Sequence, residues 1–199
     1  MLVCLMSRTV DEKRPGELRD AIVHYLVKNG LTGLSLRPLA KALGCTPRVL
    51  LYHFGSKEKM VIEVLAQVRE RQRASYDQVE APTFGEACLK IWERMSAPDS
   101  EPLFRLFFET YGMALRFPKT YRAFLHDTIE DWLQNIAEPL CREGWSPREA
   151  RAFATIVLAG LRGFMLDFCT THDRNRLDHA VSLWLRGLDS MQPADRKAL

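Results

Sequence analysis

Apolar residues recur every three or four positions along most of the chain, and no segment alternates apolar and polar residues over a useful length. This spacing is typical of amphipathic helices. The first clear apolar stripe consists of Leu18, Ile22, Tyr25 and Leu26. Gly30 follows it, and glycine readily adopts the left-handed conformation that ends many helices. The pattern predicts an all-α protein whose first helix spans residues 17–29, preceded by a loose arm over residues 1–14.

Two short helices are predicted after the first one. Ser35 can cap a helix that ends at Leu43, and Gly44 then breaks it. Thr46 can cap the next helix, with Pro47 at the first helical position, where its fixed φ is already helical. The apolar residues available for a shared core are Leu39, Ala40, Leu43, Val49 and Leu50. Because a short connection containing glycine joins the two helices, they are expected to form a helix-turn-helix, whose second helix reads a DNA groove.

Longer helices are predicted for the rest of the chain. Ser56 can cap a helix over residues 57–78. Clusters of turn-forming residues then mark the starts of helices expected near residues 83–96, 101–116, 119–143, 147–172 and 176–188. Two of these starts have the spacing of a capping box, Thr83 with Glu86 and Ser146 with Glu149. Pro139 is expected to kink the helix at residues 119–143 or to end it early.

Basic charge is concentrated at the N-terminal end. Residues 1–60 contain 10 Lys and Arg against 5 Asp and Glu, a net charge of +5, whereas residues 61–199 contain 18 against 20, a net charge of −2. Such an asymmetry is expected where one end of a protein meets a polyanion. A solvated basic face would give the same counts.

Hydrogen-bonding side chains gather where the second short helix and the long helix begin. Thr46 and Arg48 lie in the first turn of the short helix. Tyr52 and His53 follow one turn later, and Lys57 opens the long helix. The free N–H groups and the positive dipole end of a helix start both favour an anion, so these residues can converge on one sugar-phosphate strand. The competing interpretation is that Tyr52 and Phe54 belong to the core, that His53 is a surface residue and that the lysines are solvated.

The segment LSLRPLAKALGCTPRVLLYHFGSKEKM, residues 34–60, resembles the N-terminal domain of TetR-family transcriptional regulators across nearly its whole length. The matching features are the leading helix ending in Gly30, the pairs Leu39-Ala40 and Leu43-Gly44, and the runs Tyr52-His53-Phe54 and Ser56-Lys57-Glu58. The resemblance implies that Tyr52, His53 and Lys57 touch DNA phosphates and that residues 46–51 select the bases. The predicted DNA-binding residues are Ser35, Arg37, Thr46, Pro47, Arg48, Leu51, Tyr52, His53 and Lys57.

The reading helix departs from the family pattern in one respect. Pro47, Leu50 and Leu51 make it more apolar than the corresponding helix of many members. Arg48 is therefore the only long hydrogen-bonding side chain between the cap and Tyr52.

Aromatic residues crowd the C-terminal part, since residues 83–172 contain 14 of the 19 Phe, Trp and Tyr residues. Most are expected to form ordinary core, although a bundle of bulky rings can leave an apolar cavity. The resemblance implies that an inducer binds in this part. The predicted ligand-binding residues are Trp92, Phe104, Phe108, Tyr111, Trp132, Phe164 and Phe168. The candidate polar groups of such a cavity are Glu109, His126, Asp167, Thr170 and His172.

Small residues recur about one turn apart in the helix at residues 147–172, where Ala159, Gly160 and Gly163 occur. Glycine inside a helix costs roughly 1 kcal/mol relative to alanine, and close approach of another helix would explain it. The resemblance implies a four-helix bundle formed by the last two helices and the same pair of a second subunit. The predicted dimerisation residues are Ala159, Gly160, Gly163, Leu177, Val181 and Trp184, with contacts inside one chain as the alternative.

Other classes of protein have less support. No nucleophilic triad, phosphate-cradling glycine loop or H-E-x-x-H pattern occurs, so an enzyme is the weaker alternative, and no metal or cofactor is predicted. The five cysteines form no C-x-x-C pair and are expected to be free thiols, with a redox sensor as the alternative. The longest apolar run, residues 153–161, is too short for a membrane span, and the opening MLVCLM does not have the form of a secretory signal. We expect a cytoplasmic protein with no membrane partner.

The sequence predicts a bacterial, homodimeric regulator with three parts. Residues 1–56 form an arm and a helix-turn-helix domain that binds double-stranded DNA, residues 57–80 a connecting helix, and residues 81–199 a larger helical domain for effector binding and dimerisation. We expect a repressor that a hydrophobic small molecule releases from a palindromic operator. The alternatives are a DNA-binding regulator controlled by protein contacts or by thiol oxidation and, with less support, a helical enzyme.

Overall fold

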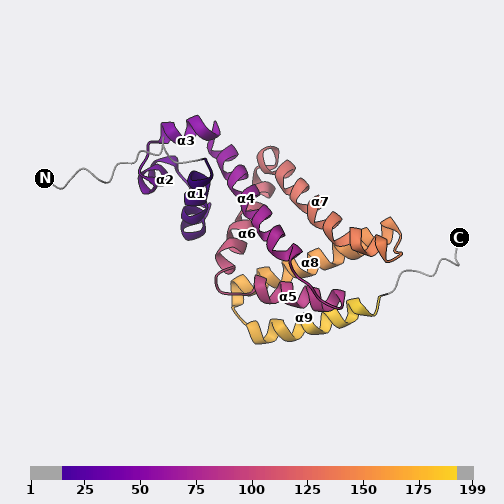
Figure 1. Ribbon diagram of the computed structural model, residues 1–199. Coiled ribbons are helices and arrows are strands. Elements are labelled where there is room, and N and C mark those ends of the chain that lie inside the picture. Colours follow the sequence, from indigo (N-terminus) through magenta and orange to yellow (C-terminus); the bar gives the residue numbers. More distant parts are fainter. Residues whose placement is uncertain (1–14, 192–199) are drawn as a thin grey trace. The chain divides into compact units, whose positions relative to one another are not determined.

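The computed structural model of the protein describes residues 15–191, and α-helices make up the ordered elements of this part (Figure 1). Their bounds are α1 Pro15–Asn29, α2 Leu36–Leu43, α3 Pro47–Phe54, α4 Lys57–Asp77, α5 Phe84–Met95, α6 Glu101–Arg116, α7 Pro118–Arg142, α8 Pro147–Thr171 and α9 Arg174–Asp189. The predicted all-α class, with a helix-turn-helix region ahead of a larger helical part, is confirmed. The arm predicted over residues 1–14 lies outside the described residues.

The predicted helices are all present, and each end differs from its expected position by no more than two residues. Local signals explain this agreement. The Thr83 hydroxyl accepts a hydrogen bond from the Glu86 N–H at 3.1 Å, and Ser146 and Glu149 form a complete capping box. The expectation that α7 would end early at Pro139 is wrong, because the helix continues to Arg142. Leu140, directly after the proline, is buried, so packing supports a turn that has lost one backbone hydrogen bond.

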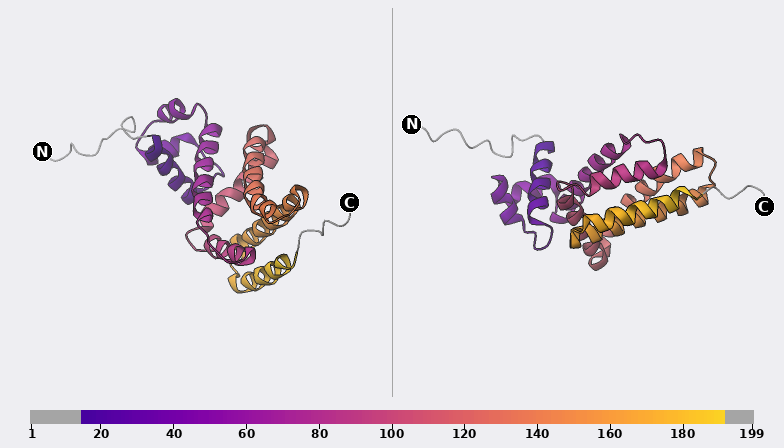
Figure 2. Two further views of the ribbon diagram at one scale, coloured as in Figure 1. Left: turned by 45° about the vertical axis from the view of Figure 1, so that its right-hand side comes forward. Right: turned by 90° about the horizontal axis from the view of Figure 1, so that it is seen from below.

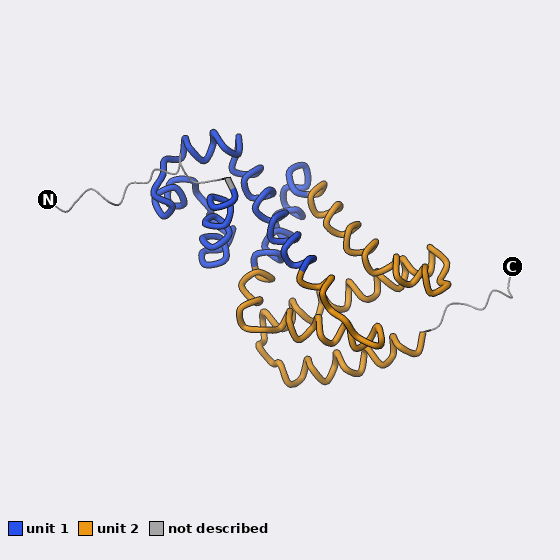
Figure 3. Tube along the Cα trace, in the orientation of Figure 1, with its two compact units in different colours: residues 1–74, 106–121 blue, residues 75–105, 122–199 orange. Residues whose placement is uncertain are grey.

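The helices form two compact units, coloured separately in Figure 3. The first unit contains the described residues up to Ala74 together with Leu106–Tyr121, and the second contains Ser75–Arg105 and the chain from Arg122 onward. The first unit therefore includes most of α4 and most of α6. Because these units describe packing, the domain limits expected at residues 56 and 80 stay predictions.

The core of the first unit is formed by apolar residues at helical spacing. Its buried members include Leu18, Ile22, Leu26, Leu31, Leu39, Ala40, Leu50, Phe54, Met60, Val61, Val64, Leu65, Leu106 and Tyr121. Polar contacts between α1 and α4 supplement this core. The Asp20 carboxylate accepts hydrogen bonds from Gln67 at 2.6 Å and from Arg71 at 2.5 Å. The helix-turn-helix, α2 and α3, thus shares a core with α1 and α4.

In the second unit α5 lies alongside α9, as Figures 1 and 2 show. The buried Trp92 donates its indole N–H to the Asp178 carboxylate at 2.6 Å. Near the other end of α5, the Gly85 N–H donates to the Asp189 carboxylate at 2.9 Å. Two carboxylates of α9 therefore hold α5 near both of its ends, which fixes the register of the pair.

The helix α8 is long and apolar enough to cross a membrane by length and composition alone, with a mean hydropathy of 1.6 over its most apolar window. Core helices of soluble proteins meet the same criterion. A buried stripe runs along α8 at helical spacing, formed by Ala150, Phe153, Ala154, Val157, Leu161, Met165 and Phe168. We therefore describe α8 as a core helix of the second unit, in contact with α9.

Four of the predicted dimerisation residues pack against other residues of the same chain. Leu177 and Val181 are fully buried against other residues of the same chain. Gly160 faces Trp184, and a Cβ at Gly160 would overlap the indole ring. The glycine thus allows α8 and α9 of one chain to approach each other closely. Gly160, Leu177, Val181 and Trp184 thus take part in packing within the chain, whereas Ala159 and Gly163 are exposed, and the dimerisation role of these residues stays a prediction.

Adding a methyl group at Gly160 tests its close packing against Trp184. We expect Gly160→Ala to lower the free energy of unfolding by about 1–3 kcal/mol, because the rigid Trp184 ring must move. The matched control is Gly112→Ala on α6, where a Cβ meets nothing within 4 Å. That change should raise stability by about 1 kcal/mol through helix propensity. Urea denaturation of both variants measures the difference, and an equal gain for both would refute the packing role of Gly160.

Candidate nucleic-acid interface

The orientation of α3 is set by its buried side. Thr46 caps the helix with an extended backbone, φ −105° and ψ 154°, and Pro47 takes the first helical position. Leu50 and Phe54 are buried, one turn apart, in the core of the first unit. The opposite side of α3 must therefore face solvent.

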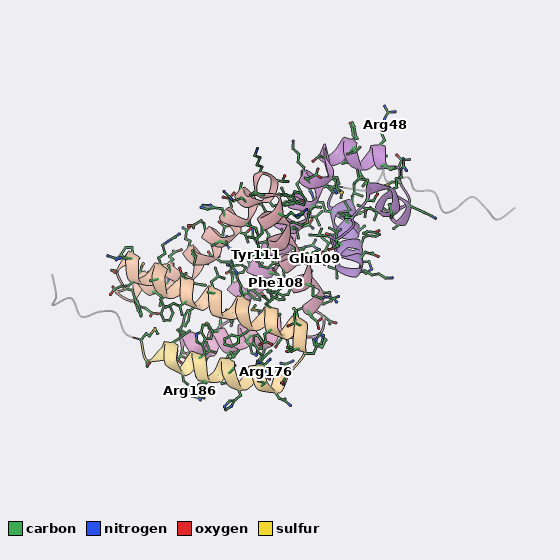
Figure 4. All side chains as sticks on the ribbon, turned by 180° about the vertical axis from the view of Figure 1, so that it is seen from behind. Arg48, Phe108, Glu109, Tyr111, Arg176 and Arg186 are labelled. Atoms are coloured by element: carbon green, nitrogen blue, oxygen red, sulfur yellow. The ribbon has the colours of Figure 1, made fainter. Side chains whose placement is uncertain are left out.

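That exposed side carries the residues predicted to bind DNA. Arg48 and His53 are exposed, Leu51 is 42% exposed and Tyr52 is 83% exposed. Figure 4 shows Arg48 projecting from α3 away from the other helices of the first unit. An exposed aromatic ring beside an exposed leucine and an arginine is the composition of a binding surface. The interpretation that places Tyr52 in the core is wrong.

The start of α2 offers unpaired backbone donors. Ser35 has the extended conformation of a capping residue, φ −124° and ψ 140°, but its hydroxyl makes no capping hydrogen bond. The predicted position of the cap is thus correct, and the predicted side-chain bond is absent. Ser35 and Arg37 are both exposed. The hydroxyl and the N–H groups of the first turn are therefore available to an anion.

The start of α4 adds a third set of donors. The Ser56 hydroxyl accepts a hydrogen bond from the Lys59 N–H at 3.1 Å, so the predicted cap is present. The Lys57 ammonium donates to the Leu34 carbonyl at 3.5 Å and lies 4.0 Å from the Glu58 carboxylate. Its side chain remains 38% exposed. An ammonium has three N–H donors, so Lys57 can hold the turn before α2 and still reach a phosphate.

The predicted ligand-binding residues fall into separate groups. Trp92 contacts the rings of Phe164 and Phe168 edge to face within the second unit, with centroids 6.1 and 6.3 Å apart. Trp132 contacts Tyr76, with ring centroids 5.7 Å apart, and Phe104 is buried in the second unit. Phe108 and Tyr111 belong to the first unit. The effector role of these residues stays a prediction.

The residues predicted as polar groups of a cavity form hydrogen bonds or ion pairs with other residues of the chain. Asp167 binds Arg176 at 2.6 Å, and this hydrogen bond lowers the pKa of the Asp167 carboxyl. His172 lies 3.5 Å from Glu101, His126 lies 3.5 Å from Asp127, and Thr170 bonds to its own helix. Glu109 accepts hydrogen bonds from backbone N–H groups of the turn between α1 and α2. Sequence reasoning missed this role because the turn and Glu109 are 78 residues apart.

Two cysteines are poorly suited to redox sensing. Burial raises the pKa of the Cys88 thiol to about 12, and the charge of Asp189 adds to the effect. Burial likewise raises the pKa of Cys169 to about 11, with a further contribution from Glu101. Because the thiolate is the reactive form, both side chains are expected to be inert near neutral pH.

Comparison with known proteins agrees with this geometry. Residues 18–64 match the family model of the bacterial regulatory proteins of the tetR family. A search of curated proteins found no match. The architecture of the first unit is that of a helix-turn-helix DNA-binding protein. Over residues 18–64 the family model confirms the resemblance to TetR-family transcriptional regulators seen in the sequence.

Solved structures share the fold over most of the chain. A transcriptional regulator from Rhodococcus sp. Rha1 is 20% identical with a TM-score of 0.75, and the match covers 88% of this chain and 96% of that one. A TetR transcriptional regulator from Legionella pneumophila is 16% identical with a TM-score of 0.68, covering 88% and 97%. The multidrug binding protein EbrR, complexed with imidazole, is 22% identical with a TM-score of 0.66, covering 92% and 98%. At these identities the likeness shows the fold.

Proposed function

We propose that the protein is a homodimeric repressor that binds a near-palindromic operator and is released by a hydrophobic small molecule. The observation that carries the proposal is the exposed side of α3, where Arg48 and Tyr52 face solvent while Leu50 and Phe54 anchor the helix. A helix held in this way can enter the major groove without losing its own packing. No enzymatic activity forms part of the proposal.

The exposed residues divide into two roles. Arg48 reads sequence, because a guanidinium can bond to O6 and N7 of guanine at the same time. Leu51 contacts the methyl group of thymine, and Thr46 and Pro47 lie at the edge of the reading surface. The phosphate contacts come from the helix starts and from the end of α3, through Ser35, Arg37, Tyr52, His53 and Lys57. Phosphate contacts set affinity, and base contacts set specificity.

The two roles predict different behaviour in DNA binding. Lys57→Ala should weaken binding to all sequences similarly and lower the salt slope by about 0.9 per lost phosphate contact. Arg48→Ala should cost about 1–3 kcal/mol on selected DNA and relax the preference at one symmetric pair of positions. Fluorescence anisotropy over a salt series, with DNA selected by the wild-type protein from a random pool, measures both effects.

Lys90→Ala on α5 is the control, because it removes a lysine that bonds to the Glu80 carbonyl and lies outside the proposed surface. An unchanged salt slope for Lys57→Ala would show that Lys57 touches no phosphate. If Arg48→Ala weakens selected and random DNA equally, Arg48 is a further phosphate contact.

The proposed dimer uses a second side of α8. Ala152, Ala159 and Gly163 are exposed on this helix, in line with Leu166, which is 50% exposed. On α9, Leu183 is 59% exposed. Small and apolar residues at helical spacing on the solvent side of neighbouring helices are suited to helix packing across a two-fold axis. A two-fold dimer presents two copies of α3, which explains the palindromic operator.

Charge placed on this face should break the dimer. We expect Gly163→Arg to yield monomers in light scattering and to lose affinity for the two-site DNA, because a bulky charge would enter the packed interface. Gly112→Arg on α6 is the matched control and should stay dimeric, since its position is open and lies on a helix outside the proposed interface. A stable dimer of Gly163→Arg would place the interface elsewhere.

The proposed release mechanism acts through α4. The first turn of this helix carries Lys57, and its last turn carries Tyr76, whose ring packs against Trp132. A ligand that displaces Trp132 would act on the end of α4 and change the position of its start. The multidrug binding protein EbrR, which shares the fold, supports a small-molecule effector. The raised pKa values of Cys88 and Cys169 count against thiol control through these two residues.

Reciprocal coupling tests this mechanism. A ligand that prefers the DNA-incompetent state about 100-fold per dimer lowers operator affinity by roughly 2.7 kcal/mol, and operator DNA must weaken ligand binding by the same factor. A hydrophobic compound that raises the melting temperature of the protein serves as the ligand. Calorimetry on the free dimer and on the DNA complex then gives the two affinities. Equal affinities would exclude this switch and favour a regulator without a small effector.

A further inference from the structure

The turn between α1 and α2, residues 30–35, is held by a side chain from α6. The Glu109 carboxylate accepts hydrogen bonds from the Leu31 N–H and, at 3.1 Å, from the Thr32 N–H. It also lies against Gly30, where an added Cβ would be 2.8 Å from a Glu109 oxygen. One carboxylate thus binds two successive backbone donors at the end of α1, and such charge-assisted bonds are stronger than neutral ones.

The conformation of the turn depends on contacts with residues outside it. It contains two glycines in the left-handed region, Gly30 and Gly33, both at φ 74°. Glycine loses more conformational freedom on folding than any other residue, so such a turn is weakly determined by its own sequence. Within it, the Leu34 N–H donates to the Leu31 carbonyl at 3.1 Å. The buried Leu31 side chain and the Glu109 carboxylate help to anchor it from outside.

The same turn supports two of the proposed DNA contacts. The Lys57 ammonium donates to the Leu34 carbonyl at 3.5 Å. Ser35, the next residue, is the N-cap of α2, and its hydroxyl makes no capping hydrogen bond. Glu109 thus binds one end of the turn, and the groups proposed to bind phosphate lie at the other end. The position of the turn therefore affects the positions of the Lys57 ammonium and the Ser35 hydroxyl.

The helix that carries Glu109 also carries aromatic residues on another side. Successive residues of a helix are about 100° apart, so Tyr111 lies roughly 160° around α6 from Glu109. Phe107 packs on Tyr111 with ring centroids 4.9 Å apart. Figure 4 shows Glu109 on the side of α6 toward the DNA-binding helices and Phe108 and Tyr111 farther from them. A rotation or shift of α6 would therefore move the carboxylate relative to the turn.

We propose that Glu109 is a positioning residue for DNA binding, which holds the α1–α2 turn so that Ser35 and Lys57 stand where phosphates bind. The inference rests on the proposed DNA-binding function. Glu109 itself touches no DNA, and its negative charge opposes DNA binding. Without this contact the turn has several conformations, and only molecules with the turn in the conformation seen here can bind DNA. The apparent affinity is then the intrinsic affinity multiplied by the fraction of such molecules.

Two variants separate positioning from charge. Glu109→Ala removes both the acceptor and the charge, whereas Glu109→Gln removes the charge and keeps an amide oxygen that can accept a hydrogen bond. We expect Glu109→Ala to weaken binding to DNA selected by the wild-type protein by about tenfold, as when a tenth of the molecules remain competent. Glu109→Gln should fall between the alanine variant and the wild type. The salt slope should stay at the wild-type value, because no phosphate contact is removed.

A charge effect predicts the opposite sign. If Glu109 acts only by repelling DNA, both variants should bind more tightly than the wild type and to the same extent, and the inference would be overturned. Glu70→Ala on α4 is the control, since it removes an exposed carboxylate of the same unit without touching the turn. Anisotropy titrations of the four proteins give the comparison.

Amide hydrogen exchange of the free protein tests the contact without DNA. The Leu31 and Thr32 amides should exchange about tenfold faster in Glu109→Ala than in the wild type, while the core of α4 is unchanged. Unchanged exchange would show that Glu109 does not hold the turn. Faster exchange with wild-type DNA affinity would overturn the positioning role and leave the proposed function intact. If the wild type selects no DNA, the proposed function fails and this inference fails with it, whatever the exchange shows.

Discussion

The burial of Leu50 and Phe54 is the constraint on which the rest of the DNA-binding surface depends. A helix of eight residues is too short to be stable alone, so α3 takes its place only through what it packs against. Its two buried residues are one turn apart and turn Arg48 and Tyr52 outward. The capping groups at Thr46 and Ser56 then set where α3 and α4 begin. Hydrophobic packing determines which polar groups are presented together.

In the second unit, the helix α8 has apolar residues on more than one side. One side packs inside the chain, where Gly160 lets Trp184 approach. Another side carries exposed Ile156 and Leu166. This double use explains why α8 is apolar enough to resemble a membrane-spanning helix by composition. A surface of this kind is usual where a soluble protein meets another protein.

Hydrogen bonds between residues far apart in the sequence fix the positions of segments that local sequence patterns do not determine. The α1–α2 turn is bound by Glu109 from α6, and α5 is bound by two carboxylates of α9. Each contact pairs a charged acceptor with an N–H group. Such bonds are directional, so they specify position where apolar packing alone would tolerate sliding. They are suited to transmit a change in one helix to a neighbouring segment.

The sequence alone determined the features that depend on near neighbours. Helix ends, the caps at Thr46 and Ser146 and the short connection between α2 and α3 follow from residues within a few positions, and the motif around Tyr52 carries the family resemblance. The tertiary structure decided which partner each apolar face meets. Leu177 and Val181 lie on the apolar face that periodicity predicts, but periodicity does not determine which surface that face packs against. The contact between Glu109 and Thr32 joins residues 77 positions apart, and no local pattern encodes it, because only the path of the folded chain brings those groups together.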